Sequence, residues 1–124
     1  MQLHALVGGA AEVIGAEATV GEAAERMVDQ AVGCLAVVDG REIVGIITEH
    51  DVVRAIAGEA DPELTLVTSV MTESPDTVPA NLSVREAAAW LLETGYRHLP
   101  VMEGGELLGI VSIKDVLWAL FQTE

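Results

Sequence analysis

Two short stretches of the sequence place a hydroxyl and a carboxylate at the start of a predicted helix. The first runs from Gly45 to Asp51 (GIITEHD), and the second follows 64 residues later, from Gly109 to Asp115 (GIVSIKD). In each, an apolar strand end leads into Thr48 or Ser112 as the helix N-cap, and the aspartate falls in the first turn. Free backbone N–H groups and the helix dipole make such a position favourable for polar or anionic groups. One such pair is explained by capping alone, whereas two pairs in register favour ligand contact.

The elements that position the first pair are predicted from capping and periodicity. Thr19 and Glu22 form a capping box at the start of a helix over 20–31, which Gly33 is expected to end. The chain then predicts a buried strand, a tight turn at Asp39-Gly40, a return strand and a second helix that Gly58 stops. The predicted ranges are 13–14 for a short edge strand, 35–38 and 43–47 for the hairpin, and 49–57 for the second helix.

The same order of elements restarts in the second half of the chain. A short strand at 77–78 precedes a second capping box, Ser83 with Glu86, and a helix that Gly95 ends. A hairpin over 99–111 turns at Gly104-Gly105, and the last helix covers 114–121. Between the halves, Leu66 to Met71 predicts a short helical turn. The halves align without a gap, which predicts an α/β (α+β) fold of two tandem β-α-β-β-α repeats packed about a pseudo-twofold axis. The boundaries are a leader at 1–12, repeat 1 at 13–58, a connector at 59–75 and repeat 2 at 76–124.

Arg97 and His98 break this symmetry. Their counterparts in repeat 1 are Gly33 and Cys34, which cannot bind phosphate. Arg97 is one of only six Lys and Arg residues, so it is the best candidate in the chain for contact with a phosphate group, with an exposed or interface-pairing side chain as the alternative.

Charge and composition exclude several classes of function. The net charge of −14 argues against binding to nucleic acid or to anionic membranes. The single cysteine permits no internal disulfide and fits a reducing compartment, so we expect a cytoplasmic protein. The three histidines lack metal-ligand spacing, which predicts no metal site. The sequence has no nucleophile elbow, phosphate loop or metalloprotease motif, so we expect no enzyme and no required cofactor.

The tandem repeat resembles the CBS-domain pair, also called a Bateman module. The resemblance rests on the two Gly-h-h-Thr/Ser-x-x-Asp stretches (h, apolar), on GYRHLPV at 95–101 and on Val70-Met71-Thr72 before Pro75. It implies a regulatory module that binds an adenosine-containing ligand: AMP, ADP, ATP or S-adenosylmethionine. It also implies a homodimer and a protein partner of unknown identity.

The resemblance further implies a role for each site residue. Asp51 and Asp115 would accept hydrogen bonds from ribose hydroxyls, and Thr48 and Ser112 would contact ribose or phosphate. Strand ends near Ile14 and Val78 would flank adenine, and Arg97 and His98 would reach phosphate. Because one repeat's cleft is often completed by the other repeat in this family, we expect the main site to combine Thr48 and Asp51 with Arg97 and His98. The cleft at Ser112 and Asp115 is then empty or takes a ligand with less phosphate.

Two alternatives stay open. A structural dimerisation module with non-binding clefts fits Gly33-Cys34 and the acidic surface. A regulatory part of a larger enzyme or channel, as in inosine monophosphate dehydrogenase or chloride channels, is less favoured than an independent small protein, because the sequence begins at Met1 and ends soon after the last predicted helix.

Overall fold

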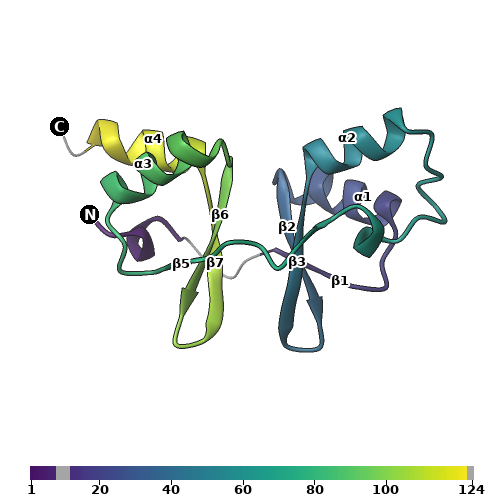
Figure 1. The fold of residues 1–124 in the computed structure, drawn as a ribbon, viewed down its shortest axis with the longest axis horizontal. Coiled ribbons are helices and arrows are strands. Elements are labelled where there is room, and N and C mark those ends of the chain that lie inside the picture. The colour runs from purple at the N-terminus through teal and green to yellow at the C-terminus, as the bar shows by residue number, and fades with distance from the viewer. Residues whose placement is uncertain (8–11, 123–124) are drawn as a thin grey trace. The chain divides into compact units, whose positions relative to one another are not determined.

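The computed structural model describes residues 1–7 and 12–122, and the chain forms two compact units. The repeat-1 unit comprises Glu12–Pro75, and the repeat-2 unit comprises Met1–Ala11 together with Asp76–Glu124. In each unit the two helices lie together beside the sheet, and a long hairpin extends beyond them (Figure 1). The described leader residues 1–7 therefore belong to the unit built by the second repeat.

The repeat-1 unit contains a four-stranded sheet in the order β1-β2-β3-β4. Strand β1 runs parallel to β2, whereas β3 is antiparallel to both β2 and β4. The Asp39–Glu42 pair closes the hairpin, which turns at Gly40 with a φ of 64°. The elements are β1 (Val13–Gly15), α1 (Val20–Gln30), β2 (Cys34–Asp39), β3 (Glu42–Thr48), α2 (Glu49–Ala57), the 3-10 turn η2 (Val67–Ser69) and β4 (Thr72–Glu73).

The repeat-2 unit contains a three-stranded sheet in the order β5-β6-β7. Its pairing copies repeat 1, with β5 parallel to β6 and β7 antiparallel to β6. Even the irregularity of the hairpin recurs, after Val37 in repeat 1 and after Val101 in repeat 2. The elements are the 3-10 turn η1 (Leu3–Leu6), β5 (Val78–Pro79), α3 (Val84–Thr94), β6 (His98–Glu103), β7 (Glu106–Ser112) and α4 (Ile113–Gln122).

The predicted capping boxes are present at both first helices. Thr19 accepts a hydrogen bond from the backbone N–H of Glu22, and Ser83 accepts one from Glu86, while each glutamate bonds back to its cap. The end of α1 was predicted wrongly. The residue that leaves the helix is Ala31, in the left-handed conformation with a φ of 56°, rather than Gly33. Two backbone bonds from the Ala31 N–H to Met27 and Val28 close the last turn there.

The leader and the connector play equivalent parts in opposite units. The Leu3 N–H donates to the Leu82 carbonyl and the Val67 N–H donates to the Ala18 carbonyl, each at 2.9 Å, and both pairs are related by the 64-residue offset. Leu3 and Val67 are both fully buried, in the core of repeat 2 and of repeat 1 respectively. The segment that precedes repeat 1 therefore completes repeat 2, and the segment that precedes repeat 2 completes repeat 1.

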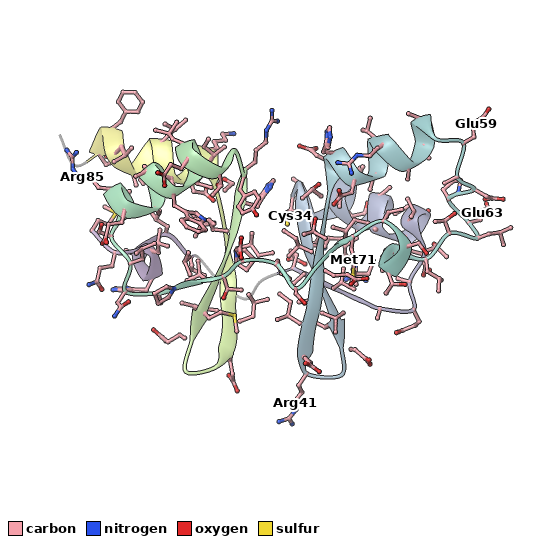
Figure 2. The ribbon with its side chains drawn as sticks, in the orientation of Figure 1. Cys34, Arg41, Glu59, Glu63, Met71 and Arg85 are labelled. Carbon is pink, nitrogen blue, oxygen red and sulfur yellow. The ribbon has the colours of Figure 1, made fainter. Side chains whose placement is uncertain are left out.

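Two glycines allow the connector and the leader, the two covering segments, to approach the sheets closely. A Cβ atom on Gly45 would lie 2.5 Å from the sulfur of Met71, a connector residue labelled in Figure 2. At the equivalent Gly109 a Cβ would overlap the Val7 side chain of the leader. The covering segments thus press directly on the backbone of β3 and β7.

The structure confirms the predicted α/β fold with two repeats of the same topology. It adds β4, an edge strand that the sequence did not predict, and it shows the predicted helical turn of the connector as the single turn η2. Among the residues that the structure describes, no helix is both long and apolar enough to span a bilayer. Pseudo-twofold packing of the two repeats stays a prediction.

Candidate functional site

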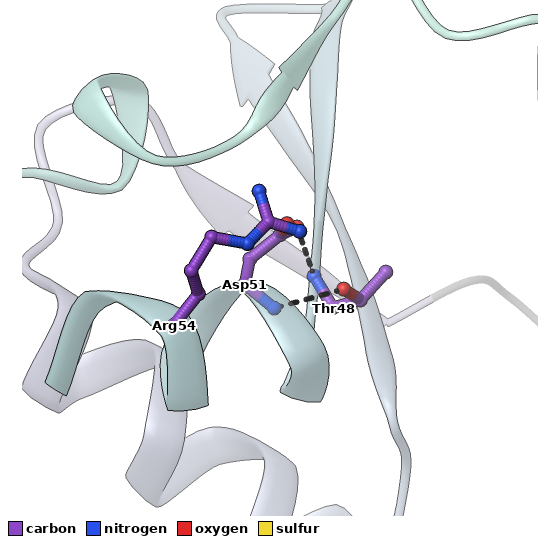
Figure 3. Close-up of polar contacts among 3 residues, drawn as sticks. All are labelled: Thr48, Asp51 and Arg54. Atoms are coloured by element: carbon purple, nitrogen blue, oxygen red, sulfur yellow. Dashed lines mark hydrogen bonds and ion pairs between the residues drawn. The ribbon is translucent and has the colours of Figure 1, made fainter. Parts of the chain in front are cut away.

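The start of α2 forms the first candidate site, which we call the repeat-1 corner (Gly33, Cys34, Thr48, Glu49 and Asp51). The Thr48 N–H donates to Asp51 Oδ2 at 2.9 Å, and the Asp51 N–H donates to Thr48 Oγ1 at 3.2 Å (Figure 3). Asp51 is the one charged side chain that is buried among the described residues, with 7% of its surface exposed. Its Oδ1 lies 3.8 Å from the guanidinium of Arg54, which is itself largely exposed. A carboxylate with one oxygen used for capping keeps acceptor capacity on the other.

The first residue of β2 and the glycine before it lie next to Thr48 and Glu49 in this corner. Cys34 lies opposite Thr48 in the β2–β3 register, and the Gly33 carbonyl accepts the Glu49 N–H at 2.9 Å. Burial, and secondarily the negative charge of Asp51, raises the pKa of the Cys34 thiol to about 12. The thiol is therefore protonated and unreactive at neutral pH, as expected for a structural cysteine.

The start of α4 forms the second candidate site, the repeat-2 corner (Arg97, His98, Ser112 and Asp115). The Ser112 N–H donates to Asp115 Oδ2 at 3.0 Å, and the Asp115 N–H donates to Ser112 Oγ at 3.1 Å. His98 lies opposite Ser112 in the β6–β7 register, and the Arg97 carbonyl accepts the Ile113 N–H at 2.8 Å. The backbone of this corner matches repeat 1, but Asp115 is exposed where Asp51 is buried.

The two corners differ most in charge. The backbone position of Arg97 in repeat 2 is that of Gly33 in repeat 1, and a Cβ on Gly33 would lie only 3.1 Å from the carboxylate of Glu49. The repeat-1 corner therefore has one carboxylate beside this position, whereas the residue at this position in the repeat-2 corner is an arginine. An arginine at this position favours contact with a phosphate group, which glycine beside Glu49 does not.

Ile14 and Val78, the predicted adenine walls, occupy equivalent positions on β1 and β5. Ile14 pairs with Val37 and Val78 pairs with Val101, and both side chains are buried in the core of their own unit. Each side chain is thus first a core residue, and contact with a base stays a prediction.

The structure brings some of the predicted site residues together within each unit. Thr48 joins Asp51 in the repeat-1 unit, and His98, Ser112 and Asp115 join in the repeat-2 unit. The combination of Thr48 and Asp51 with Arg97 and His98 spans the two units and stays a prediction. Among the described residues, no group of three or more His, Cys, Asp or Glu side chains could hold a metal ion.

One polar contact near the repeat-2 corner was missed from the sequence. The Tyr96 hydroxyl donates to Asp76 Oδ2 at 3.0 Å, and this hydrogen bond raises the pKa of Tyr96 above its ordinary value. The two residues are 20 positions apart, in loops without periodic signal, so the pattern of the chain could not pair them.

Comparison with known proteins identifies the family. The CBS domain model matches residues 11–58 and 67–122, one match for each repeat. The chain belongs to the CBS-domain family. A CBS pair from Burkholderia ambifaria, described as a putative signal-transduction protein, superposes with a TM-score of 0.94 at 30% identity, covering all of this chain and 96% of that one. The predicted membership of this family is thereby confirmed.

Relatives of this CBS pair vary in length. An uncharacterized 17.7 kDa protein of Acidianus ambivalens is 39% identical over 110 residues, which are 87% of this chain and 66% of the relative. The chain spans about two thirds or less of the first curated relatives that it matches. A CBS domain protein from Pyrobaculum aerophilum, solved with AMP, shares the fold with a TM-score of 0.87 at 24% identity over 98% of this chain and 99% of that one.

Proposed function

We propose that this CBS pair is a non-catalytic regulatory module that binds an adenosine-containing ligand and signals to a partner protein through a change in its repeats. The observation that carries the proposal is the pair of Thr/Ser–Asp corners, each fixed by reciprocal hydrogen bonds at a helix start. Burying Asp51 costs solvation that a cap alone does not require, because the equivalent Asp115 caps equally well while exposed. Two proteins of similar fold, a CBS domain protein from Pyrobaculum aerophilum and CBSX2, have been solved in complex with AMP, which supports the same ligand class here.

In the proposal, different residues contact the ribose, the phosphate and the adenine of the ligand. In the proposal Asp51 and Asp115 accept hydrogen bonds from ribose hydroxyls, and Thr48 and Ser112 contact ribose or phosphate. Arg97 and His98 bind phosphate, since a guanidinium presents several donors in a planar fork. Ile14 and Val78 flank adenine at the edge strands. No cofactor is required, and we place the protein in the cytoplasm on the basis of its lone cysteine.

The proposal is tested by thermal unfolding with AMP, ADP, ATP, S-adenosylmethionine and adenosine, each at about 1 mM, with GMP as the control ligand. A ligand at 100 times its dissociation constant stabilises the folded state by about 2.7 kcal/mol, which raises the melting temperature by several degrees. We expect at least one adenosine ligand to do so while GMP does not. A flat panel would reject the proposal for this ligand class.

A structural dimerisation module is the second candidate, and exposed apolar side chains favour it. On α4, Leu117, Trp118 and Phe121 are 50%, 60% and 80% exposed, and on α2, Val53 and Ile56 are at least half exposed. Monomeric proteins rarely expose large apolar side chains in one contiguous patch. This candidate predicts a homodimer by light scattering, which Trp118→Glu disrupts, with no response to any member of the ligand panel.

A further inference from the structure

The two repeats hold the residue before their first strand in different ways. In repeat 1 the Ala36 N–H donates to the carbonyl of Glu12, directly before β1, at 3.0 Å. Pro100 stands at the position of Ala36 in repeat 2, and proline has no N–H to donate. Repeat 2 therefore cannot form this backbone bond to Asp76, the counterpart of Glu12.

The missing bond is a local exception, because the next bond between the same two strands recurs. It measures 2.9 Å in repeat 1 and 3.0 Å in repeat 2, from the N–H of Ala16 to the carbonyl of Val38 and from Ala80 to Met102. A second contact at the start of β1 also lacks an equivalent donor. The Arg26 guanidinium donates to the Val13 carbonyl at 2.7 Å, and the residue at the position of Arg26 in repeat 2 is Trp90.

Tyr96 supplies a different bond to the same residue. Its hydroxyl donates to Asp76 Oδ2 at 3.0 Å, whereas Val32, at the equivalent position of repeat 1, carries no hydroxyl. The residue before the first strand is thus held by a backbone N–H in repeat 1 and by a phenol in repeat 2. Both Tyr96 and Asp76 belong to the repeat-2 unit, so this bond lies within a single unit.

The backbone of Tyr96 is itself held at the end of α3. The Tyr96 N–H donates to Thr94 Oγ1 at 3.3 Å, and the Thr94 hydroxyl donates to the Trp90 carbonyl at 2.8 Å. Gly95, between them, closes the helix with a φ of 78° and donates its N–H to the Leu91 carbonyl. The Tyr96 hydroxyl therefore connects Asp76 to the end of a helix rather than to a free loop.

The bond also joins two segments that carry proposed ligand contacts. Tyr96 directly precedes Arg97, the proposed phosphate-binding residue, and Asp76 lies two residues before Val78, the proposed adenine wall. A ligand that has both an adenine and a phosphate requires these segments at a fixed spacing. A nucleoside without phosphate does not use Arg97 and is indifferent to that spacing.

We propose that Tyr96 is a positioning residue for nucleotide binding in the repeat-2 unit, where its bond to Asp76 replaces the backbone bond that Pro100 excludes. The bond holds Arg97 and Val78 at the spacing that one AMP molecule requires. The inference rests on the proposed adenosine-ligand function and deepens it, because it names a residue that favours a nucleotide over its nucleoside.

The size of the effect is limited by the bond itself. When the bond is lost, a smaller fraction of the protein has the segments at the required spacing, and the apparent affinity falls by that factor. One hydrogen bond changes an equilibrium constant by about two- to tenfold. Tyr96 is 45% exposed, so we expect a value in the lower half of this range.

The test measures the affinities of AMP and adenosine by isothermal titration, with thermal unfolding to check that each variant is folded. Tyr96→Phe removes the hydroxyl without changing the charge, and we expect it to weaken AMP about three- to fivefold and adenosine less than about 1.5-fold. Adding Pro100→Ala to this variant installs the residue of repeat 1 and supplies the N–H that can donate to the Asp76 carbonyl. We expect the double variant to recover the AMP affinity of the wild type to within about twofold.

Two pairs of variants separate the hydrogen bond from the charge of Asp76. Asp76→Asn and Asp76→Ala remove the same charge, but only the asparagine keeps an oxygen that can accept the Tyr96 hydroxyl. We expect AMP to bind Asp76→Ala about three- to fivefold more weakly than Asp76→Asn. Glu12→Ala is the matched control in repeat 1, because there the bond uses the backbone carbonyl, and its ratio of AMP to adenosine affinity should equal that of the wild type.

Several results would overturn the inference and leave the proposed function standing. These are equal losses of AMP and adenosine affinity in Tyr96→Phe, equal AMP affinities of Asp76→Asn and Asp76→Ala, or a loss in Tyr96→Phe that Pro100→Ala does not recover. Binding of another adenosine ligand without binding of AMP would also overturn it. Absence of binding by every adenosine ligand would reject the proposed function and the inference together.

Discussion

Replacing Asp51 separates the part that its carboxylate plays in the fold from its proposed part in ligand binding. In Asp51→Ala the partly buried Thr48 N–H loses its acceptor at 2.9 Å, while the bond from the residue 51 N–H to Thr48 Oγ1 remains. Loss of a cap contact typically costs about 1 kcal/mol, and an unpaired buried N–H costs about 1–3 kcal/mol. We therefore expect the free energy of unfolding to fall by about 1–2 kcal/mol.

Two matched variants show how much of this loss of stability comes from the missing cap contact and how much from its burial. In Asp51→Asn the amide oxygen still accepts the Thr48 N–H, so we expect a loss of less than about 1 kcal/mol. In Asp115→Ala the same cap contact is broken at an exposed position, where water replaces the carboxylate, and the expected loss is about 0.5 kcal/mol. The ion pair of Asp51 with Arg54 adds little to these values, since the guanidinium is exposed and its nitrogen lies 3.8 Å away.

We expect the variants to rank differently in ligand affinity than in stability. A hydrogen bond to a charged acceptor contributes about 1.5–3 kcal/mol, so its loss weakens binding at least about tenfold. Both Asp51→Ala and Asp51→Asn should show this loss, although the asparagine variant keeps nearly all of its stability. Urea unfolding gives the stability of each variant, and isothermal titration with AMP, or with the ligand that the thermal panel identifies, gives the affinity.

The decisive comparison is therefore Asp51→Asn. An affinity within about threefold of the wild type in this variant would refute the assignment of Asp51 as a ribose acceptor and leave it as a buried cap. Equal losses of stability in Asp51→Ala and Asp115→Ala would refute the argument from burial.

Two further predictions concern burial within single units. Because the pKa of the Cys34 thiol is raised to about 12, iodoacetamide at pH 8 should label the native protein at least about a hundredfold more slowly than the protein in urea; comparable rates would contradict its burial. The stability that comes from this raised pKa is fully present below about pH 8.5 and is lost as the pH rises toward 12, which urea midpoints at pH 8 and pH 10 will show. Leu3→Ala should cost about 2–5 kcal/mol and lower the exchange protection of β6 and β7 before that of β2 and β3. The matched Val67→Ala should reverse this order, and an unchanged order would contradict the assignment of leader and connector to opposite units.

The sequence predicted the elements whose signals are local. Thr19 with Glu22 and Ser83 with Glu86 are short-range patterns, and the structure shows both as reciprocal caps. The hairpins could also be predicted from the sequence, because a tight turn needs glycine where φ is positive. The family followed from two copies of one stretch in the same register.

What the sequence did not predict depends on contacts between distant segments. The edge strand β4 has only two residues, too few for a periodic pattern, and it forms because β3 offers it a free edge. Ala31 adopts the left-handed conformation because its N–H closes the last turn of α1, a choice that overrides the preference for glycine. The 64-residue offset does relate Leu3 to Val67 and Val7 to Met71, so the part played by the leader could have been found by extending the repeat alignment toward the N-terminus.

The exchange of leader and connector means that each unit is completed by a segment from outside its own repeat. The fully buried Leu3 in the repeat-2 unit comes from the segment that precedes repeat 1. The fully buried Val67 in the repeat-1 unit comes from the segment that leads into repeat 2. Each covering segment presses on the glycine of a strand, β3 or β7, that leads directly into a candidate corner. In the proposed module, a ligand that shifts β3 must therefore also act on the connector, and one that shifts β7 must act on the leader.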